Sequence, residues 1–164
     1  MGIALAMVTS YIKIWDMPMG GSVTLLSMLF ICIIGYWFGP KYGLITGVAY
    51  GILQFAVDPY MLSLPQVLLD YPLAFGALGL SGFFSNKKYG LQIGYVAGVL
   101  GRFVCATLSG VIFFAAYAPE GMNPWVYSAL YQGTYLGAEG LITLIIISVP
   151  PVSRALSAVK TQAE

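Results

Sequence analysis

The sequence predicts an all-α fold, a bundle of six helices that spans a lipid bilayer with both termini in the cytoplasm. The first observation is composition, because 59% of the 164 residues are hydrophobic and 8% are charged, whereas soluble domains carry about a quarter charged residues. The second is that the apolar residues fall into six runs separated by turn-forming residues. The third is that Lys and Arg gather in alternate loops.

The six apolar runs approach the roughly 17–25 residues that a membrane-spanning helix needs, although some are short. In chain order they cover residues 2–15, 22–38, 42–57, 64–84, 90–116 and 126–149. Segments rich in Gly, Pro and charge separate them: WDMPMGGS, GPKYG, VDPY, SNKKYG and APEGMNP. The remainder holds no soluble domain, so residues 1–164 are predicted to form a single transmembrane domain.

Glycines spaced four residues apart open the third and fifth runs. They are Gly39, Gly43, Gly47 and Gly51 in the third run and Gly90, Gly94 and Gly98 in the fifth. Such a stripe follows one helix face and lets a neighbouring backbone approach closely. We expect these glycines to serve helix packing rather than ligand binding.

The basic residues assign the orientation of the bundle. One set of alternate loops and the C-terminal tail contain Lys41, Lys87, Lys88, Arg154 and Lys160. The opposite loops contain one base and three acids: Lys13, Asp16, Asp58 and Glu120. By the positive-inside rule the first set faces the cytoplasm, which places both termini inside the cell. The first residues lack a basic n-region and a cleavage site, so we expect no cleaved signal peptide.

Composition also excludes several kinds of chemistry. The chain contains no His, which rules out His-based zinc sites and Ser-His-Asp catalysis. Cys32 and Cys105 fall inside apolar runs, so we interpret them as small buried hydrophobes rather than as a disulfide or a metal site. A net charge of +1 argues against a nucleic-acid partner. We expect no metal and no cofactor.

Three ionisable residues lie inside the predicted spans: Asp70, Arg102 and Glu139. A charge at the bilayer centre costs on the order of 2.5–3.5 kcal/mol, so each needs a partner or a water-filled cavity. At about 1.5 Å per residue, Arg102 lies roughly 18 Å from the inner surface and Glu139 roughly 20 Å from the outer surface. Because both are near mid-membrane on consecutive antiparallel helices, we expect them to form a structural ion pair.

This pairing leaves Asp70 without a partner. It lies in LPQVLLDYPLAFGALGLSGFF, about one and a half turns into the fourth run from the outer side, next to Tyr71. Two interpretations are open. Either Asp70 caps a broken helix end or bonds a neighbouring hydroxyl, or it provides the counter-charge for a bound cation that enters from outside.

An aromatic cluster surrounds the connection between the fifth and sixth runs on the same outer side. It comprises Phe113, Phe114, Tyr117, Trp125, Tyr127, Tyr131 and Tyr135. Such rings are typical of an interfacial belt and equally of a ligand site. The amide of Gln132 and the carboxylate of Asp70 at the same depth favour a site, because aromatic faces attract flat cationic rings. The expected ligand is small, planar, polar and positively charged.

Four longer stretches carry a further signal: MPMGGSVTL, GPKYGLITGVAYGILQF, LPQVLLDYPLAFGALGLSGFF and RFVCATLSGVIFFAAYAPEGMNPWVYSALYQGTYL. Together they resemble the ThiT family, the thiamin-specific S components of energy-coupling factor (ECF) transporters. The resemblance implies a six-helix protein of the prokaryotic plasma membrane that captures thiamin from outside. It also implies partners, the membrane scaffold subunit EcfT and two cytoplasmic ATPases. This chain has no Walker A motif, as expected of a subunit that does not hydrolyse nucleotide.

The resemblance also implies roles for single residues. The acid of the family's pocket corresponds to Asp70, and the tyrosine that follows it corresponds to Tyr71. The aromatic residue that stacks on the ligand ring corresponds to Phe114, and a further pocket tyrosine corresponds to Tyr127. The loop that covers the site corresponds to the segment around Gly20 and Gly21. The first helix of the family contacts the scaffold through a small-xxx-small pair, whose positions here are Ala4 and Val8. The β-branched Val8 loosens close packing, so half of that motif survives.

Two positions depart from the family pattern. Ala106 stands where the family typically has a pocket His, and Gln132 stands where it typically has Asn. The first change deletes a ring contact, and the second lengthens the amide by a methylene. We expect the pocket either to bind thiamin more weakly or to accept a related molecule, such as a thiamin precursor or degradation product.

Two other classes of function compete with a vitamin-binding protein. A membrane enzyme needs an activated nucleophile, and the candidates Ser109 and Cys105 have neither a His nor an intramembrane Lys to activate them. A secondary transporter works without partner subunits, but the six spans show no obvious inverted repeat. We therefore expect a binding protein and not an enzyme.

Overall fold

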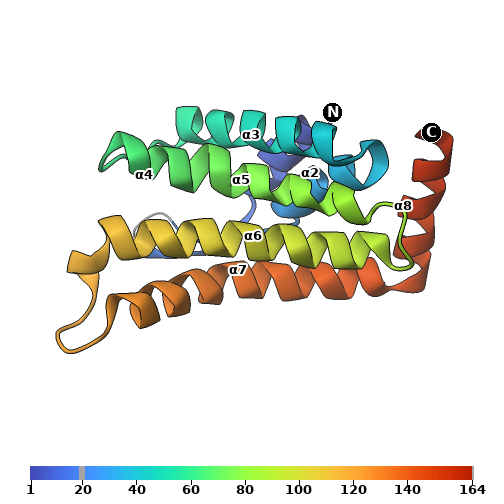
Figure 1. Ribbon diagram of the computed structural model, residues 1–164. Coiled ribbons are helices and arrows are strands. Elements are labelled where there is room, and N and C mark those ends of the chain that lie inside the picture. Colours follow the sequence, from blue (N-terminus) through green and yellow to red (C-terminus); the bar gives the residue numbers. More distant parts are fainter. Residues whose placement is uncertain (19–20, 164) are drawn as a thin grey trace.

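The computed structural model describes residues 1–18 and 21–163, which form a helical bundle with a short β-hairpin (Figure 1). Its α-helices are α1 (Gly2–Ser10), α2 (Ser27–Phe38), α3 (Pro40–Val57), α4 (Leu64–Leu68), α5 (Ala74–Gly76), α6 (Gly90–Phe113), α7 (Pro124–Ser148) and α8 (Pro150–Ala163). A π-helical turn, η2 (Leu69–Leu73), and a 3-10 helix, η3 (Ala77–Phe84), join α4 and α5 into one continuous rod. A second 3-10 turn, η4 (Ala115–Tyr117), follows α6. The strands β1 (Lys13–Asp16) and β2 (Ser22–Thr24) pair in antiparallel fashion.

The predicted all-α membrane bundle is confirmed. Within the described residues, three helical segments are long and apolar enough to cross a bilayer: Leu64–Phe84, Gly90–Phe113 and Pro124–Ser148. The apolar helix α2 is shorter, with 12 residues, and α3 has 18. In Figure 1, α3, the rod from α4 to η3, α6 and α7 run side by side, and α8 crosses one end of the bundle.

The predicted bounds of the first two runs are wrong. The first run is helical only to Ser10 and then continues as β1, and the second becomes helical at Ser27, after β2. The β-branched Val23 and Thr24 favour a strand. Leu26 has a φ of 63°, which a right-handed helix does not allow. Helix α8 was not expected because its sequence is too polar to register as an apolar run.

The glycine stripe packs as predicted where α2, α3 and η3 meet. Gly43 of α3 faces Gly35 of α2 and Gly79 of η3. A Cβ atom on Gly43 would lie 2.7 Å from the Cα of Gly35 and 3.0 Å from that of Gly79. The next two glycines of the stripe pack in the same way against the backbone of α5 and η2. Gly39 instead forms the turn between α2 and α3, with a φ of +90°.

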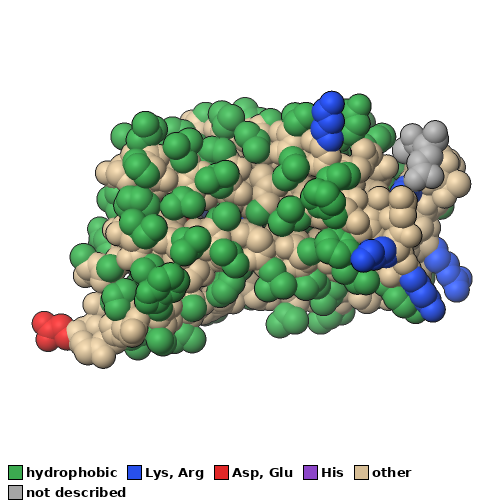
Figure 2. All heavy atoms as spheres, in the orientation of Figure 1, with side chains coloured by type: hydrophobic (Ala, Val, Ile, Leu, Met, Phe, Trp, Pro, Cys, Tyr) green, Lys and Arg blue, Asp and Glu red, His purple; other side chains and the backbone are tan. Residues whose placement is uncertain are grey.

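On the face that Figure 2 shows, the visible charged side chains lie at the two ends of the bundle. Lys and Arg side chains gather near α8, an acidic side chain marks the opposite tip, and hydrophobic side chains cover the face between them. Lys41 starts α3, and Lys87 and Lys88 lie between η3 and α6. Helix α8 is fastened at this end by a hydrogen bond of 3.0 Å that Trp37 Nε1 donates to the carbonyl of Leu156. The segregation agrees with the predicted orientation, in which this end faces the cytoplasm.

Gly43→Ala should lower the free energy of unfolding by about 1–3 kcal/mol, because the added methyl group meets backbone atoms of two helices. Thermal unfolding of the purified protein in detergent measures this as a lower melting temperature. Gly137→Ala in α7 is the matched control, since nothing lies within 4 Å of its Cβ position. Equal melting temperatures for the two variants would contradict the close glycine contact.

Candidate functional site

A cavity of about 160 Å³ lies between the hairpin, α3, the α4–η2 segment, α6 and α7. The residues predicted to bind substrate all line it: Gly21, Asp70, Tyr71, Ala106, Phe114, Tyr127 and Gln132. Gly20, which the resemblance also implicates, lies outside the described residues. The structure therefore brings the predicted set together, and its role in binding stays a prediction.

A π-helical turn presents Asp70 to the cavity. The turn contains Pro72, which lacks a backbone N–H and cannot continue regular α-helical bonding. The Asp70 carboxylate accepts a hydrogen bond of 2.5 Å from Gln66 Nε2 and lies near the hydroxyl of Ser109. In the described part of the chain, no Lys or Arg nitrogen lies within 4.0 Å of this carboxylate. Among the described residues, Asp70 thus has polar neighbours but no cation in direct contact, although Arg102 lines the same cavity.

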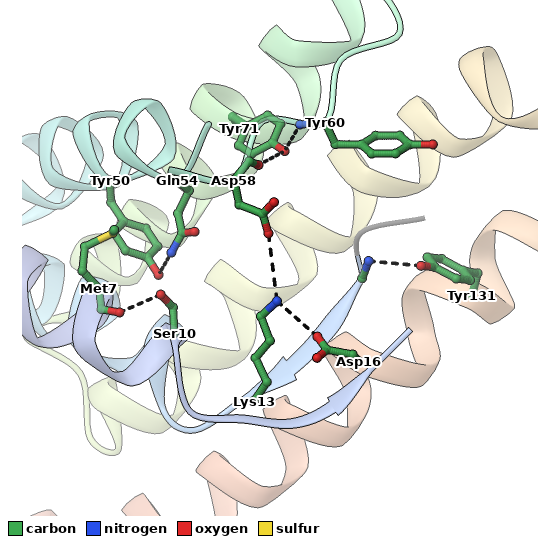
Figure 3. Close-up of polar contacts among 11 residues, drawn as sticks. Met7, Ser10, Lys13, Asp16, Tyr50, Gln54, Asp58, Tyr60, Tyr71 and Tyr131 are labelled. Carbon is green, nitrogen blue, oxygen red and sulfur yellow. Dashed lines mark hydrogen bonds and ion pairs between the residues drawn. The ribbon is translucent and has the colours of Figure 1, made fainter. Parts of the chain in front are cut away.

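Tyr71 braces the turn between α3 and α4 (Figure 3). Its hydroxyl accepts a hydrogen bond from the backbone N–H of Tyr60 and donates one to the carbonyl of Asp58, both at 3.1 Å. Its ring packs edge-on against Phe55, with the ring centroids 5.2 Å apart. The hydroxyl of Tyr71 is thus engaged in the turn, while the residue also lines the cavity.

Aromatic rings form much of the cavity wall. Phe114 stacks on Tyr60, with centroids 5.8 Å apart and an angle of 20° between the ring planes. On α7, Tyr127 contacts Tyr131 with centroids 6.4 Å apart. All four rings line the cavity, so they are more than an interfacial belt. Trp125, from the same sequence cluster, is 54% exposed and is not part of the wall.

The two positions that depart from the family pattern contact each other. Gln132 Nε2 donates a hydrogen bond of 3.2 Å to the backbone carbonyl of Ala106. The side-chain oxygen of Gln132 accepts a hydrogen bond from the hydroxyl of Tyr135. The Gln132 side chain therefore extends from α7 to α6, next to Ala106, whose small side chain leaves room for the amide.

The expected ion pair between Arg102 and Glu139 is not formed. Lys13 makes both ion pairs found within 4.0 Å among the described residues. Glu139 is 2% exposed, and its carboxylate instead accepts hydrogen bonds from β2 and the start of α2. The donors are Thr24 N at 3.2 Å, Thr24 Oγ1 at 2.8 Å, Ser27 Oγ at 3.1 Å and Met28 N at 3.3 Å. The guanidinium of Arg102 lies 4.1 Å from the centroid of the Phe75 ring, a cation–π contact.

The pairing prediction failed for two physical reasons. Depth in the membrane does not determine which face of a helix a residue occupies. In addition, the N–H groups at the start of a helix have no intrahelical partners and attract a carboxylate. Both Arg102 and Glu139 still line the cavity.

Residues of the β-hairpin line one side of the cavity. The Lys13 ammonium lies 3.2 Å from the carboxylate of Asp16 and 4.0 Å from that of Asp58, at the end of α3 (Figure 3). The backbone N–H of Gly21 donates a hydrogen bond of 3.1 Å to the hydroxyl of Tyr131. These contacts fasten the hairpin to α3 on one side and to α7 on the other.

Sequence reasoning missed several residues of the cavity wall, above all Gln66, Tyr60 and Lys13. Gln66 could have been found, because it precedes Asp70 by one helical turn and so shares its face. Tyr60 lies in a loop and Lys13 in a strand. Hydrophobicity patterns do not predict which loop or strand folds over a pocket.

The bundle and its cavity define a class of protein. A membrane-embedded cavity that combines a carboxylate outside any direct ion pair, aromatic rings and side-chain amides is typical of an integral membrane protein that binds a small solute. Comparison with known proteins narrows this class. The family model described as "Thiamine transporter protein (Thia_YuaJ)" matches residues 1–158. The chain belongs to this family of thiamine transporters and is a multi-pass protein of the bacterial plasma membrane.

Individual relatives confirm the resemblance to the ThiT family. Thiamine transporter ThiT of Bacillus subtilis is 36% identical over 146 residues, which cover 80% of this chain and 76% of the relative. Thiamine transporter ThiT of Lacticaseibacillus paracasei is 29% identical over 126 residues, 69% of this chain and 61% of the relative. A solved structure of ThiT from Listeria monocytogenes matches with a TM-score of 0.73 at 25% identity, covering 92% of this chain and 91% of that one. The first two are named as transporters and not as enzymes, which sets the enzyme alternative aside.

Glu139→Ala should lower the free energy of unfolding by about 2–4 kcal/mol, because buried donors of β2 and α2 lose their acceptor. Thermal unfolding measures the loss. Adding Arg102→Met to this variant should not restore stability, because the two charges are not paired. Recovery of wild-type stability in the double variant would reinstate the ion pair.

Proposed function

We propose that this protein captures thiamin, or a closely related cationic heterocycle, from outside the cell in the cavity that Asp70 lines. The observation that carries the proposal is a carboxylate that has no Lys or Arg in direct contact among the described residues and that lies beside aromatic rings. Thiamin joins a permanently charged thiazolium ring to a flat aminopyrimidine. One carboxylate can pair with the charge, and aromatic ring faces can stack on the flat rings. The names of the relatives support the same substrate class.

Each predicted site residue has a role in this proposal. Asp70 supplies the counter-charge, and Phe114 and Tyr127 offer ring faces. Tyr71 shapes the wall and holds the α3–α4 turn through its hydroxyl. The remaining positions are Gln132 for an amide contact, Ala106 for a small apolar surface and Gly21 for the covering hairpin. An occupied cavity then gives the intramembrane carboxylate the partner that its position requires.

We also propose that the protein is the S component of an ECF importer, working with an EcfT scaffold subunit and two cytoplasmic ATPases. The chain has no Walker A motif, so ATP hydrolysis falls to other subunits. Ala4 and Val8 of α1 are exposed on the outside of the bundle, where a membrane partner can reach them. Small residues on such a face favour close helix contacts.

Asp70→Asn should weaken thiamin binding by about 2–5 kcal/mol, because the neutral amide leaves the cation unpaired. Isothermal titration calorimetry on the purified protein measures the affinity, and thermal unfolding checks that the variant folds. Glu120→Gln, in the α6–α7 connection, is the control and should bind like the wild type.

Two results would count against this assignment. Near-wild-type affinity in Asp70→Asn would make Asp70 a structural residue. Wild-type protein without saturable binding below about 10 μM, a free energy of roughly −7 kcal/mol, would exclude thiamin as the ligand.

The variant Ala106→His distinguishes a pocket for thiamin from a pocket adapted to a related ligand. Ala106 is buried in the cavity wall, and an added ring there contacts a flat ligand, which is worth about 0.5–1.5 kcal/mol. We therefore expect tighter thiamin binding in this variant. Weaker thiamin binding would favour a thiamin precursor or degradation product that fits the present Ala106–Gln132 contact. Mass spectrometry of the compound that co-purifies with the wild type then identifies it.

A further inference from the structure

Gln66 lies in α4, one turn before Asp70, and is 1% exposed. Both polar atoms of its side chain, Nε2 and Oε1, are hydrogen-bonded. Nε2 donates hydrogen bonds to Asp70 Oδ2 at 2.5 Å and to the carbonyl of Tyr60 at 3.3 Å. Oε1 accepts a hydrogen bond from the backbone N–H of Leu62 at 3.0 Å. Because an amide has two donor hydrogens and one acceptor oxygen, these partners admit a single orientation of the Gln66 side chain.

This orientation determines how Asp70 is held. The oxygen of Gln66 faces Leu62, so its NH₂ group faces the carboxylate. The Oδ2 atom of Asp70 thereby accepts one hydrogen bond, and the remaining lone pairs of the carboxylate are left for other partners. A carboxylate held in this way does not have to be ordered when a ligand arrives, which strengthens binding.

The same amide also holds the aromatic wall. The carbonyl of Tyr60 accepts a hydrogen bond from Gln66. The N–H of Tyr60 donates one to the hydroxyl of Tyr71 (Figure 3). The Tyr60 ring stacks on Phe114 at the end of α6, with centroids 5.8 Å apart. Gln66 therefore links the Asp70 carboxylate to a pair of stacked rings within one cavity.

We propose that Gln66 is a positioning residue for ligand recognition, which holds the Asp70 carboxylate and the Tyr60–Phe114 ring pair in a fixed relation. Both then meet a single planar cation at once. This inference rests on the proposed function, because it takes thiamin as the ligand. Selectivity then follows from this fixed relation. A cation without a flat ring contacts only the Asp70 carboxylate, and a flat ring without a charge contacts only the Tyr60–Phe114 ring pair.

A double-mutant cycle tests the link. Gln66→Met keeps the length of the side chain and removes its hydrogen bonds. In otherwise wild-type protein it should weaken thiamin binding about tenfold or more, because the carboxylate loses the donor that orients it. In an Asp70→Ala background the same change should cost less, because only the hold of Gln66 on the Tyr60–Phe114 ring pair remains to be lost. Isothermal titration calorimetry to saturation measures all four affinities.

Gln92→Met is the matched control. Gln92 Nε2 also bridges two elements, with hydrogen bonds of 3.2 Å to the carbonyl of Ile147 and 3.3 Å to Ser153 Oγ, but next to α8 and outside the cavity wall. Its replacement should leave thiamin affinity unchanged in both backgrounds. If Gln66→Met lowers thiamin affinity by the same factor in both backgrounds, the inference about Gln66 is overturned and the proposed function is not. If the wild type does not bind thiamin, the proposed function itself is overturned.

Should Gln66→Met fail to fold, a cycle of Tyr60→Ala with Asp70→Ala tests the same link. If Gln66 joins the two sites, the combined loss of thiamin affinity should be smaller than the product of the two single losses. A combined loss equal to that product means that the carboxylate and the ring act independently, which overturns the inference.

Discussion

A carboxylate buried in a membrane protein needs a positive charge or water, and the described part of this chain provides no Lys or Arg within 4.0 Å of Asp70. The surroundings of Asp70 follow from that constraint. The π-helical turn around Pro72 exposes the carboxylate to a cavity, and rings and amides form the rest of the wall. Polar groups at this depth are costly unless they are hydrogen-bonded, and here they converge on one cavity.

Helix packing is what brings those groups together. The glycine stripe of α3 lets its backbone lie directly against the rod that contains the π-helical turn. The hairpin is fastened at both sides, by Lys13 to the end of α3 and by Gly21 to α7. The site is therefore assembled from segments far apart in the sequence, each held by a contact that depends on a small or polar residue.

Much of the site could be predicted because its residues are conspicuous in apolar surroundings. Asp70 and the aromatic residues near the α6–α7 connection break the hydrophobic pattern, and all of the residues predicted to bind substrate line the cavity. The partner of Glu139 could not be predicted, because backbone N–H groups leave no trace in a sequence. The hairpin was hidden for a similar reason: Val23 and Thr24 suit a strand or an apolar run, and only the pairing with β1 decides between them.

The arrangement of Glu139 and Arg102 has a consequence for the energy of the protein in the bilayer. Since neither neutralises the other directly, both count in the formal charge of the intramembrane part of the cavity wall, together with Asp70. One of these three side chains is cationic and two are anionic, which leaves an excess of one negative charge. Under the function proposed above, a monovalent cationic ligand cancels that excess, so the occupied cavity carries no formal net charge. Because the self-energy of an uncompensated charge is high in a low-dielectric medium, ligand binding then lowers the electrostatic cost of keeping this cavity within the lipid.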